Sequence, residues 1–377
     1  MRGYCIPTLI LLCFWSAQLF GQRPGFSWDF GTEQGRIFKH TKKIAFSIPD
    51  HSYGIGLNFQ YQTFGKEEWH QHQGYPLMGF GMQYYNFGDR EILGNAVSFF
   101  PNLTLKILDK PRWMVHFRVG SGIAWIDRTY DRLNNPQNNS IGSRMNNTTC
   151  FRLTAGFAIS PRWAVFAGGS FTHFSNGAFQ MPNLGINIPA VSASLRYTPQ
   201  PVEKEGYVRW EESKRPPGRF GVQGYFSLAY KETSFPGAAK WPVYAGSLAG
   251  IYRISKVQNL LIGAEYEYYQ SVFVFSRHTF SAASAEQARR EATRRGVFLA
   301  TEWQFGNTGL LVQLGYYVNP NNNPVPFPVY NKLGLRYYLR PIARSGAQFY
   351  GGIYLKSHII TADYISIGIG LRFLQFS

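Results

Sequence analysis

Short segments in which apolar residues alternate with polar or glycine residues dominate this chain of 377 residues. In residues 53–61 the odd positions are aromatic or aliphatic, and the even positions are Gly, Asn or Gln. The same rhythm returns in residues 113–120, 220–228, 262–268, 332–337 and 366–373. Successive side chains of a β-strand point to opposite faces, so a period of two predicts an all-β protein.

The character of the two faces favours a membrane barrel over a soluble sandwich, although both alternate in this way. Aromatic residues gather toward segment ends, and the face opposite the apolar one is rich in Gly with charges interspersed. The last segment ends on an outward Phe373, as in the C-terminal signal of outer-membrane barrels. We therefore expect the outer-membrane assembly machinery as a partner. Beyond the N-terminus no apolar run reaches the length of a transmembrane helix.

Strand counting predicts one transmembrane antiparallel β-barrel of about 14–16 strands in the bacterial outer membrane. Two tandem eight-stranded barrels are the alternative, and one barrel is preferred because two in a single chain would be unusual. An apolar run behind Met1 and Arg2 predicts a secretory signal peptide. The expected parts are the signal peptide at 1–21, a periplasmic lead-in without clear periodicity at 22–38, a first barrel half at 39–199, a proline-bearing periplasmic connector at 200–218, and a second barrel half at 219–377.

Loop lengths predict the orientation of the strands. Short turns are expected at residues 109–112, 160–161, 255–258 and 306–309. Longer polar loops alternate with them, at about 131–147, 178–186, 277–294 and 320–326. Outer-membrane barrels have short periplasmic turns and long external loops, so the long loops are predicted to face outward from the cell.

One predicted strand carries a candidate catalytic pair. His173 and Ser175 lie two residues apart and therefore share a face. A hydroxyl beside an imidazole is the minimal pair for a serine nucleophile with its general base. Asn187, on the returning strand, has the parity needed to approach His173 across the hairpin and orient it. The face is predicted to meet lipid, so a lipid substrate would reach the pair. The alternative is that the two side chains only complete hydrogen bonds.

The segment His173-Phe-Ser-Asn-Gly177, followed by Pro182-Asn183 and a returning strand, resembles the active-site hairpin of the outer-membrane lipid A 3-O-deacylases. It also resembles the acyloxyacyl hydrolase proteins grouped with them. The resemblance covers about residues 40–199 and implies an eight-stranded barrel enzyme that removes an ester-linked acyl chain from lipid A of lipopolysaccharide. It also implies that Ser175 is the nucleophile, that His173 is the base, and that Asn176 and Gly177 form the oxyanion hole.

The chain departs from the family at Asn187, where the family has Glu. A carboxylate fixes the tautomer of the base and stabilises the imidazolium, whereas a neutral amide supplies only the first effect. We therefore expect lower activity from an Asn at this position, unless an acid from elsewhere approaches. The alternative for Asn187 is a turn residue that starts the strand.

Charged residues add two weaker expectations. Lipid A carries phosphates, which Arg binds in bidentate fashion. The candidate phosphate contacts, which could equally be solvated loop residues, are Arg144, Arg289, Arg290, Arg294 and Arg295. Inward charges are expected to form salt bridges in the lumen, namely Glu265, Glu267, Lys332 and Arg336.

Other chemistries find no support in the sequence. Cys5 and Cys13 would leave with the signal peptide, so Cys150 has no partner for a disulfide. We expect no metal, no cofactor and no nucleic-acid partner, and the net charge of +17 suits anionic lipid. The competing prediction for function is a porin-like or structural outer-membrane barrel with a vestigial active-site hairpin.

Overall fold

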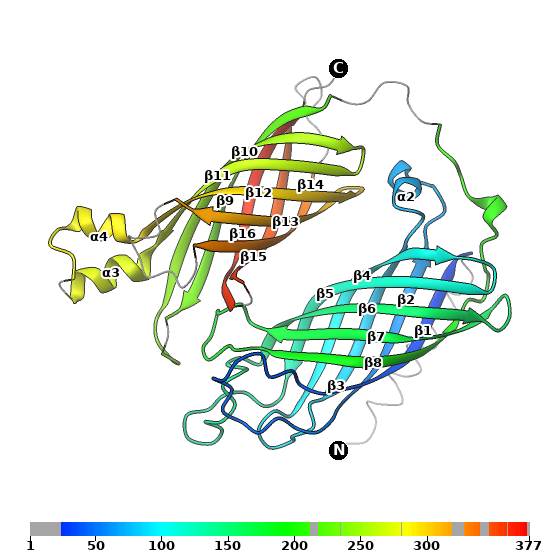
Figure 1. The fold of residues 1–377 in the computed structure, drawn as a ribbon, viewed down its shortest axis with the longest axis horizontal. Helices are drawn as coiled ribbons and strands as arrows, with labels where there is room; N and C mark the ends of the chain where they lie inside the picture. The colour runs from blue at the N-terminus through cyan, green and yellow to red at the C-terminus, as the bar shows by residue number, and fades with distance from the viewer. Residues whose placement is uncertain are drawn as a thin grey trace, which may run out of the picture. The chain divides into compact units, whose positions relative to one another are not determined.

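The computed structural model consists of two compact units, one built from β1–β8 and the other from β9–β16 (Figure 1). It describes residues 24–211, 218–233, 235–279, 281–318, 328–339, 347–359 and 361–374. The predicted signal peptide at 1–21 and the whole of the predicted loop at 320–326 lie outside these residues. Within them no helix is long and apolar enough to cross a membrane.

The first unit is a closed antiparallel barrel of eight strands. Its closure runs through β1 and β8, where Gly35 pairs with Ala190 and Trp28 with Tyr197. A short helix, α2 (Glu68–His72), lies between the second and third strands. The strands are β1 (Phe26–Gly35), β2 (Ser52–Gln62), β3 (Leu77–Asn86), β4 (Asn95–Asp109), β5 (Trp113–Ile126), β6 (Met145–Ala158), β7 (Trp163–Ser175) and β8 (Ile186–Tyr197).

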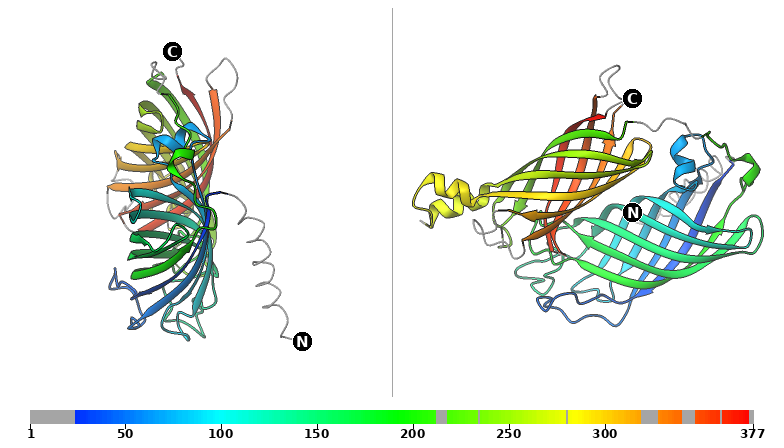
Figure 2. Two further views of the ribbon diagram at one scale, coloured as in Figure 1. Left: turned by 90° about the vertical axis from the view of Figure 1, so that its right-hand side faces the viewer. Right: turned by 45° about the horizontal axis from the view of Figure 1, so that its top comes forward.

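The second unit is another closed antiparallel barrel of eight strands, whose seam joins β9 to β16. Two helices, α3 (Gln270–His278) and α4 (Ala285–Glu291), lie between its third and fourth strands. Further views of both barrels are given in Figure 2. The strands are β9 (Phe220–Glu232), β10 (Lys240–Ser255), β11 (Gln258–Tyr269), β12 (Thr293–Phe305), β13 (Thr308–Tyr317), β14 (Val329–Tyr338), β15 (Ala347–His358) and β16 (Thr361–Leu374).

Two predictions about this architecture are wrong. The preferred single barrel is replaced by its alternative, two tandem barrels, because β8 returns to β1 instead of pairing with β9. The predicted lead-in at 22–38 contains β1, whose Ser27, Asp29 and Glu33 face the lumen while Phe30 is 52% exposed on the outer wall. This strand of 10 residues supplies the eighth member that the first half needed, since a sheet without it would have left two open edges.

Part of the predicted connector at 200–218 packs against the first barrel. It contains the 3₁₀ turn η1 (Lys204–Gly206). Val208 N–H donates to the Phe64 carbonyl at 2.8 Å, and Trp210 Nε1 donates to the Gly65 carbonyl at 2.7 Å. These bonds attach the connector to the loop between β2 and β3, at the end of the barrel where the β4–β5 and β6–β7 turns are short.

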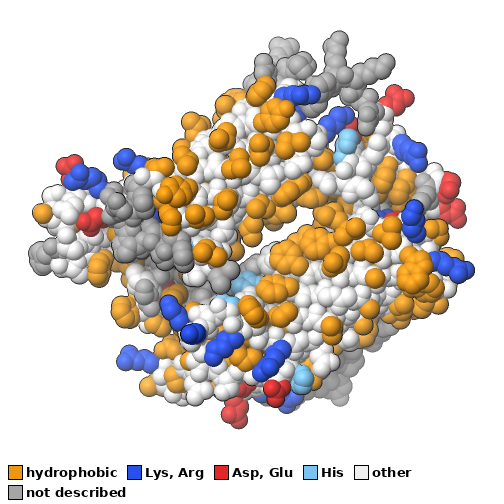
Figure 3. Space-filling model, in the orientation of Figure 1, with side chains coloured by type: hydrophobic (Ala, Val, Ile, Leu, Met, Phe, Trp, Pro, Cys, Tyr) orange, Lys and Arg blue, Asp and Glu red, His pale blue; other side chains and the backbone are white. Residues whose placement is uncertain are grey.

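The side chains sort by face as a membrane barrel requires. Hydrophobic side chains cover the visible outer walls of both barrels, and most charged side chains lie toward the strand ends (Figure 3). The predicted lumen salt bridges are confirmed, since Lys332 pairs with Glu265 and Arg336 Nη1 lies 3.3 Å from Glu302 Oε1. In the first barrel Asp29 pairs with both Arg118 and Arg196. Side chains therefore fill the lumens, as expected for eight strands.

Candidate active site

The hairpin of β7 and β8 places the predicted pair opposite its predicted partner. His173 pairs with Asn187 in the β7–β8 ladder, so the predicted register is confirmed. On the same face of β7, Val165 and Phe171 are 40% and 37% exposed, whereas the intervening Phe166 is only 3% exposed. Strand parity therefore places the candidate residues on the outer face of the barrel, at the strand ends joined by a long loop, where Ser175 itself is 4% exposed.

Hydrogen bonds link the three side chains in one line. His173 Nε2 lies 2.8 Å from Ser175 Oγ, and His173 Nδ1 lies 2.6 Å from Asn187 Oδ1. An amide oxygen only accepts hydrogen bonds, so Nδ1 of His173 carries the proton. Nε2 then holds the lone pair and accepts from the Ser175 hydroxyl. This is the tautomer that a general base for Ser175 requires.

Gly185 packs against this pair, in a position and a backbone conformation that disfavour a side chain. Its φ of +78° lies in the left-handed region, and a Cβ atom there would lie 3.1 Å from Cε1 of His173 and 3.6 Å from Cβ of Ser175. The Gly185 amide donates to the Ser140 carbonyl at 3.0 Å, which ties it to the loop between β5 and β6. The backbone at Gly185 therefore packs directly against His173.

The predicted oxyanion residues begin the loop that follows β7. The Asn176 amide N–H donates to Asn183 Oδ1 at 2.9 Å, and Asn176 Nδ2 donates to the Gln180 carbonyl at 2.8 Å. Gly177 has a φ of +61°, which glycine adopts without strain. The donors of Asn176 thus hold the loop together in this structure, next to Ser175 but not directed at an open site.

A fourth residue, His40, was missed from the sequence. Asn187 Nδ2 lies 3.0 Å from His40 Nδ1, so the line of side chains continues from Ser175 through His173 and Asn187 to His40. His40 lies in the loop after β1, the strand that was mistaken for a lead-in. Alternation in residues 26–33 was the signal that could have placed this loop beside β8.

A groove lies on the outer wall closer to the other end of β7, where its lining residue nearest in sequence to His173 is Ala167. Its volume is about 640 Å³, and small residues form its floor. Bulkier side chains flank it, and the groove is lined among others by Gly31, Ala155, Gly156, Ala167, Ala193, Phe30, Trp113, Phe157, Val165 and Leu195. An apolar groove of this size on a lipid-facing wall can hold a hydrocarbon chain.

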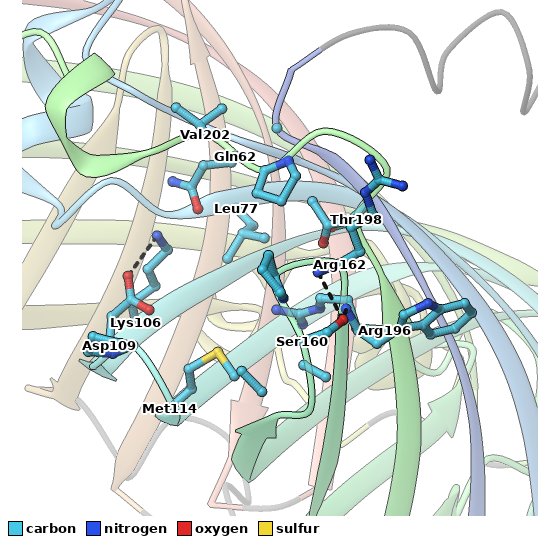
Figure 4. Close-up of a pocket in the computed structure, with 18 of the residues that line it drawn as sticks. Gln62, Leu77, Lys106, Asp109, Met114, Ser160, Arg162, Arg196, Thr198 and Val202 are labelled. Carbon is cyan, nitrogen blue, oxygen red and sulfur yellow. Dashed lines mark hydrogen bonds and ion pairs between the residues drawn. The ribbon is translucent and has the colours of Figure 1, made fainter.

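A second cavity, of about 610 Å³, lies at the opposite end of the first barrel (Figure 4). It is lined by Lys106, Arg162 and Arg196, and it touches the first residues of β7, whereas His173 lies near the last. Connector residue Tyr207 also lines it, and burial, with the nearby Asp109 carboxylate, raises the pKa of Tyr207 to about 12. This polar mouth is remote from the catalytic pair.

Four of the five predicted phosphate contacts are exposed, and the fifth faces the lumen. Arg289 and Arg290 are exposed on α4, and Arg295 is exposed at the start of β12. Arg144 is exposed beside β6, and its guanidinium lies 5.7 Å from the Trp125 ring. The prediction for Arg294 is wrong, because this side chain turns into the lumen, where Nη1 lies 3.3 Å from Asp363 Oδ2.

No metal-binding cluster of His, Cys, Asp or Glu occurs among the described residues. Cys150 is buried as a free thiol. The groups that the structure brings together at this site are a hydroxyl, an imidazole and an amide.

Comparisons with known proteins agree with this class of molecule. Residues 53–196 match the family described as lipid A 3-O-deacylase (PagL), and residues 220–375 match the family described as acyloxyacyl hydrolase, C-terminal domain. No curated protein matches the chain.

Solved structures of outer-membrane barrels also align with the chain. The outer membrane enzyme PagL is 17% identical, with a TM-score of 0.34, over 44% of this chain and 97% of its own. Neisserial surface protein A is 11% identical, with a TM-score of 0.30, over 46% of this chain and 97% of its own. OccAB4 of Acinetobacter baumannii is 9% identical, with a TM-score of 0.24, over 94% of this chain and 99% of its own.

The fold and the family matches together define an outer-membrane β-barrel hydrolase. The chain belongs to the lipid A 3-O-deacylase and acyloxyacyl hydrolase family, with the deacylase part in the first barrel and the C-terminal domain in the second. Its substrate is lipid A of the outer membrane. A porin-like function loses its basis, because eight strands with filled lumens leave no wide aqueous channel.

Proposed function

We propose that this protein removes an ester-linked acyl chain from lipid A by a serine–histidine mechanism centred on Ser175. The observation that carries the proposal is the line of hydrogen bonds from Ser175 through His173 to Asn187 on the outer wall. A substrate in the outer leaflet would meet this wall directly. A water-soluble substrate would not reach it.

The chemistry follows from the tautomer of His173. Nε2 takes the hydroxyl proton as Ser175 Oγ attacks the ester carbonyl, and the same proton then passes to the departing sugar oxygen. Water, deprotonated by His173, hydrolyses the acyl–Ser175 ester and releases a fatty acid. Asn187 holds Nδ1–H throughout and keeps the lone pair on Nε2 directed at the reacting atoms.

The oxyanion is assigned to donors at Asn176 and Gly177. Since the Asn176 donors hold the loop in the present structure, one of them would exchange its loop partner for the developing negative charge. Such a donor is worth about 10²- to 10³-fold in kcat in other hydrolases.

The test is Ser175→Ala with Ser170→Ala as the control. Ser170 lies on the same strand with its side chain on the lumen side, 8% exposed. Its replacement removes a hydroxyl from β7, as Ser175→Ala does, but leaves the outer face unchanged. Each form is expressed in a Gram-negative host, and lipid A is weighed by mass spectrometry. We expect loss of an acyl chain with the wild type and Ser170→Ala, and unchanged lipid A with Ser175→Ala.

Two outcomes would contradict the proposal. Deacylation by Ser175→Ala at the wild-type rate would remove Ser175 from the mechanism. Fully acylated lipid A in the presence of the folded wild type would show that the protein lacks this activity.

Recognition of β16 and its outward Phe373 by the assembly machinery stays a prediction.

A further inference from the structure

The amide of Asn187 is held between two imidazoles. Its oxygen faces His173 Nδ1 at 2.6 Å, and its nitrogen faces His40 Nδ1 at 3.0 Å. A carboxylate has two equivalent oxygens and presents an acceptor whichever way it turns. An amide has one acceptor end and one donor end, so an Asn in this position must be held in one of its two orientations.

The wrong orientation would disable the base. If Nδ2 of Asn187 faced His173, two donors would meet, and Nδ1 of His173 would have to give up its proton to accept. The proton would then lie on Nε2, which could no longer accept from Ser175. The orientation of the Asn187 amide thus decides whether the base is competent.

We propose that His40 is the positioning residue that sets the Asn187 amide, and through it the tautomer of His173. This inference rests on the proposed function. In its role His40 is neutral, with the lone pair on Nδ1 and the proton on Nε2, so that Nδ1 accepts from Asn187 Nδ2. His40 thereby supplies part of what an acidic residue at 187 would supply directly.

The fold delivers His40 to this place by extending β1 along β8. The Phe38 amide donates to the Asn187 carbonyl at 2.8 Å, and the Arg36 amide donates to the Pro189 carbonyl at 3.4 Å. The β1–β8 ladder therefore continues past its last regular pair, Gly35 with Ala190. His40 lies two residues after Phe38, with its backbone N–H 3.0 Å from the Phe38 carbonyl.

A competing acceptor makes this contact sensitive to protonation. His40 Nδ1 lies 3.0 Å from Asn187 Nδ2 but also 3.4 Å from the Phe38 carbonyl oxygen. A protonated Nδ1 would donate to Phe38 and would repel the Asn187 donor. The charged groups near this contact are His173 on β7 and, in the β1–β2 loop, Arg36, Lys39, Lys42, Lys43 and Asp50, of which Asp50 pairs with Arg36 at 3.7 Å.

The decisive experiment is a double-mutant cycle of His40→Ala and Asn187→Glu, read as kcat/KM on lipid A in mixed micelles at a pH above the imidazole titration. Loss of one hydrogen bond predicts a decrease of about five- to tenfold for His40→Ala in the wild-type background. A carboxylate at 187 needs no orientation, so His40→Ala should change the Asn187→Glu protein by less than about twofold.

Two further variants test the role if Asn187→Glu fails to fold. His40→Gln keeps an acceptor for Asn187 and should retain activity within about twofold of wild type, because its side-chain oxygen can replace Nδ1. His51→Ala is the control and should have no effect. His51 is an exposed histidine at the end of the same loop, and its ring lies 6.0 Å from the Tyr53 ring.

The outcomes separate this inference from the proposed function. Equal losses from His40→Ala in both backgrounds, no loss in either, or a His40→Gln protein as impaired as His40→Ala would each overturn the positioning role. If Ser175→Ala is inactive while His40→Ala is fully active, the proposed function stands and this inference fails. If Ser175→Ala is fully active, the proposed function fails first.

Discussion

The last hairpin of each barrel carries a histidine with a polar partner, but the two hairpins direct these groups to opposite sides of the wall. On β7, His173 lies on the outer face and bonds to Ser175 and Asn187. On β15, His358 is 8% exposed inside the lumen, where Nε2 lies 3.0 Å from the Tyr317 hydroxyl. Only the first arrangement places a serine hydroxyl beside the histidine on the outer face, where Ser175 is 4% exposed.

Strand parity explains the difference. Residues 165–169 resemble residues 348–352 in sequence, and each stretch precedes a histidine. Yet the aligned phenylalanines face opposite ways, with Phe166 3% exposed and Phe349 51% exposed. A shift of one residue moves every side chain of a strand to the other face. Similar sequences in two barrels thus give one cluster on the outer face and one cluster in the lumen.

The partners differ as sharply as the faces. Asn187 is neutral and contacts two imidazoles, whereas Asp363 lies 4.0 Å from His358 and pairs with Lys231 and Arg294. The Asp363 carboxylate therefore interacts mainly with the two cations of the lumen network and only weakly with His358. An acid beside a histidine is therefore no sign of catalysis unless both face the substrate.

The largest expected contrast comes from removing each histidine. His173→Ala should lower kcat on lipid A by about 10³- to 10⁴-fold, because the base for Ser175 is lost. His358→Ala should leave the rate within about twofold, since that side chain faces the lumen. Release of fatty acid from purified lipid A measures both. A comparable loss from His358→Ala would mean that the second barrel takes part in the reaction.

An intermediate effect is expected on stability. Asp363→Asn leaves the partly buried Lys231 and Arg294 without their carboxylate and should lower the free energy of unfolding by about 3 kcal/mol. Urea titration of the protein refolded in lipid vesicles measures this change. Asp50→Asn is the control, because the Arg36–Asp50 pair is exposed. An unchanged urea midpoint for Asp363→Asn would show that the network tolerates the lost charge.

The smallest expected contrast concerns substrate binding by the two barrels. Replacing Arg144, in the barrel that carries the catalytic pair, with Ala should raise KM for lipid A by about two- to threefold, through loss of an exposed phosphate contact. Arg290→Ala, on α4 of the second barrel, should change KM less. The reverse order would assign lipid recognition to the second barrel.

Much of this architecture can be predicted from sequence alone, and the exceptions have physical causes. Alternation, loop lengths and the face of His173 predict the barrel class and the hairpin, because side-chain period and antiparallel register are local properties. Closure is not local. Whether β8 pairs with β1 or with β9 depends on which strand edge is available. Without β1 the sequence offers no partner that closes the first barrel at β8, and it gives no reason to place His40, in the loop after β1, beside Asn187.

Arg294 shows the remaining limit. It belongs to a run of basic residues beside a helix, where an exposed position is a reasonable expectation from composition. The structure continues β12 back to Thr293, so Arg294 alternates with Arg295 and falls on the lumen face. Strand ends are the hardest boundaries to predict, and a shift of one residue decides between a phosphate contact and a lumen ion pair.

The seam between β1 and β8 also bears on how such a chain could arise. A ring that returns to its own first strand has no unpaired strand edge, so the strand pairing of the first sheet is complete without β9–β16. The second sheet closes in the same way. A change that removed one sheet would therefore leave every strand pair of the other intact.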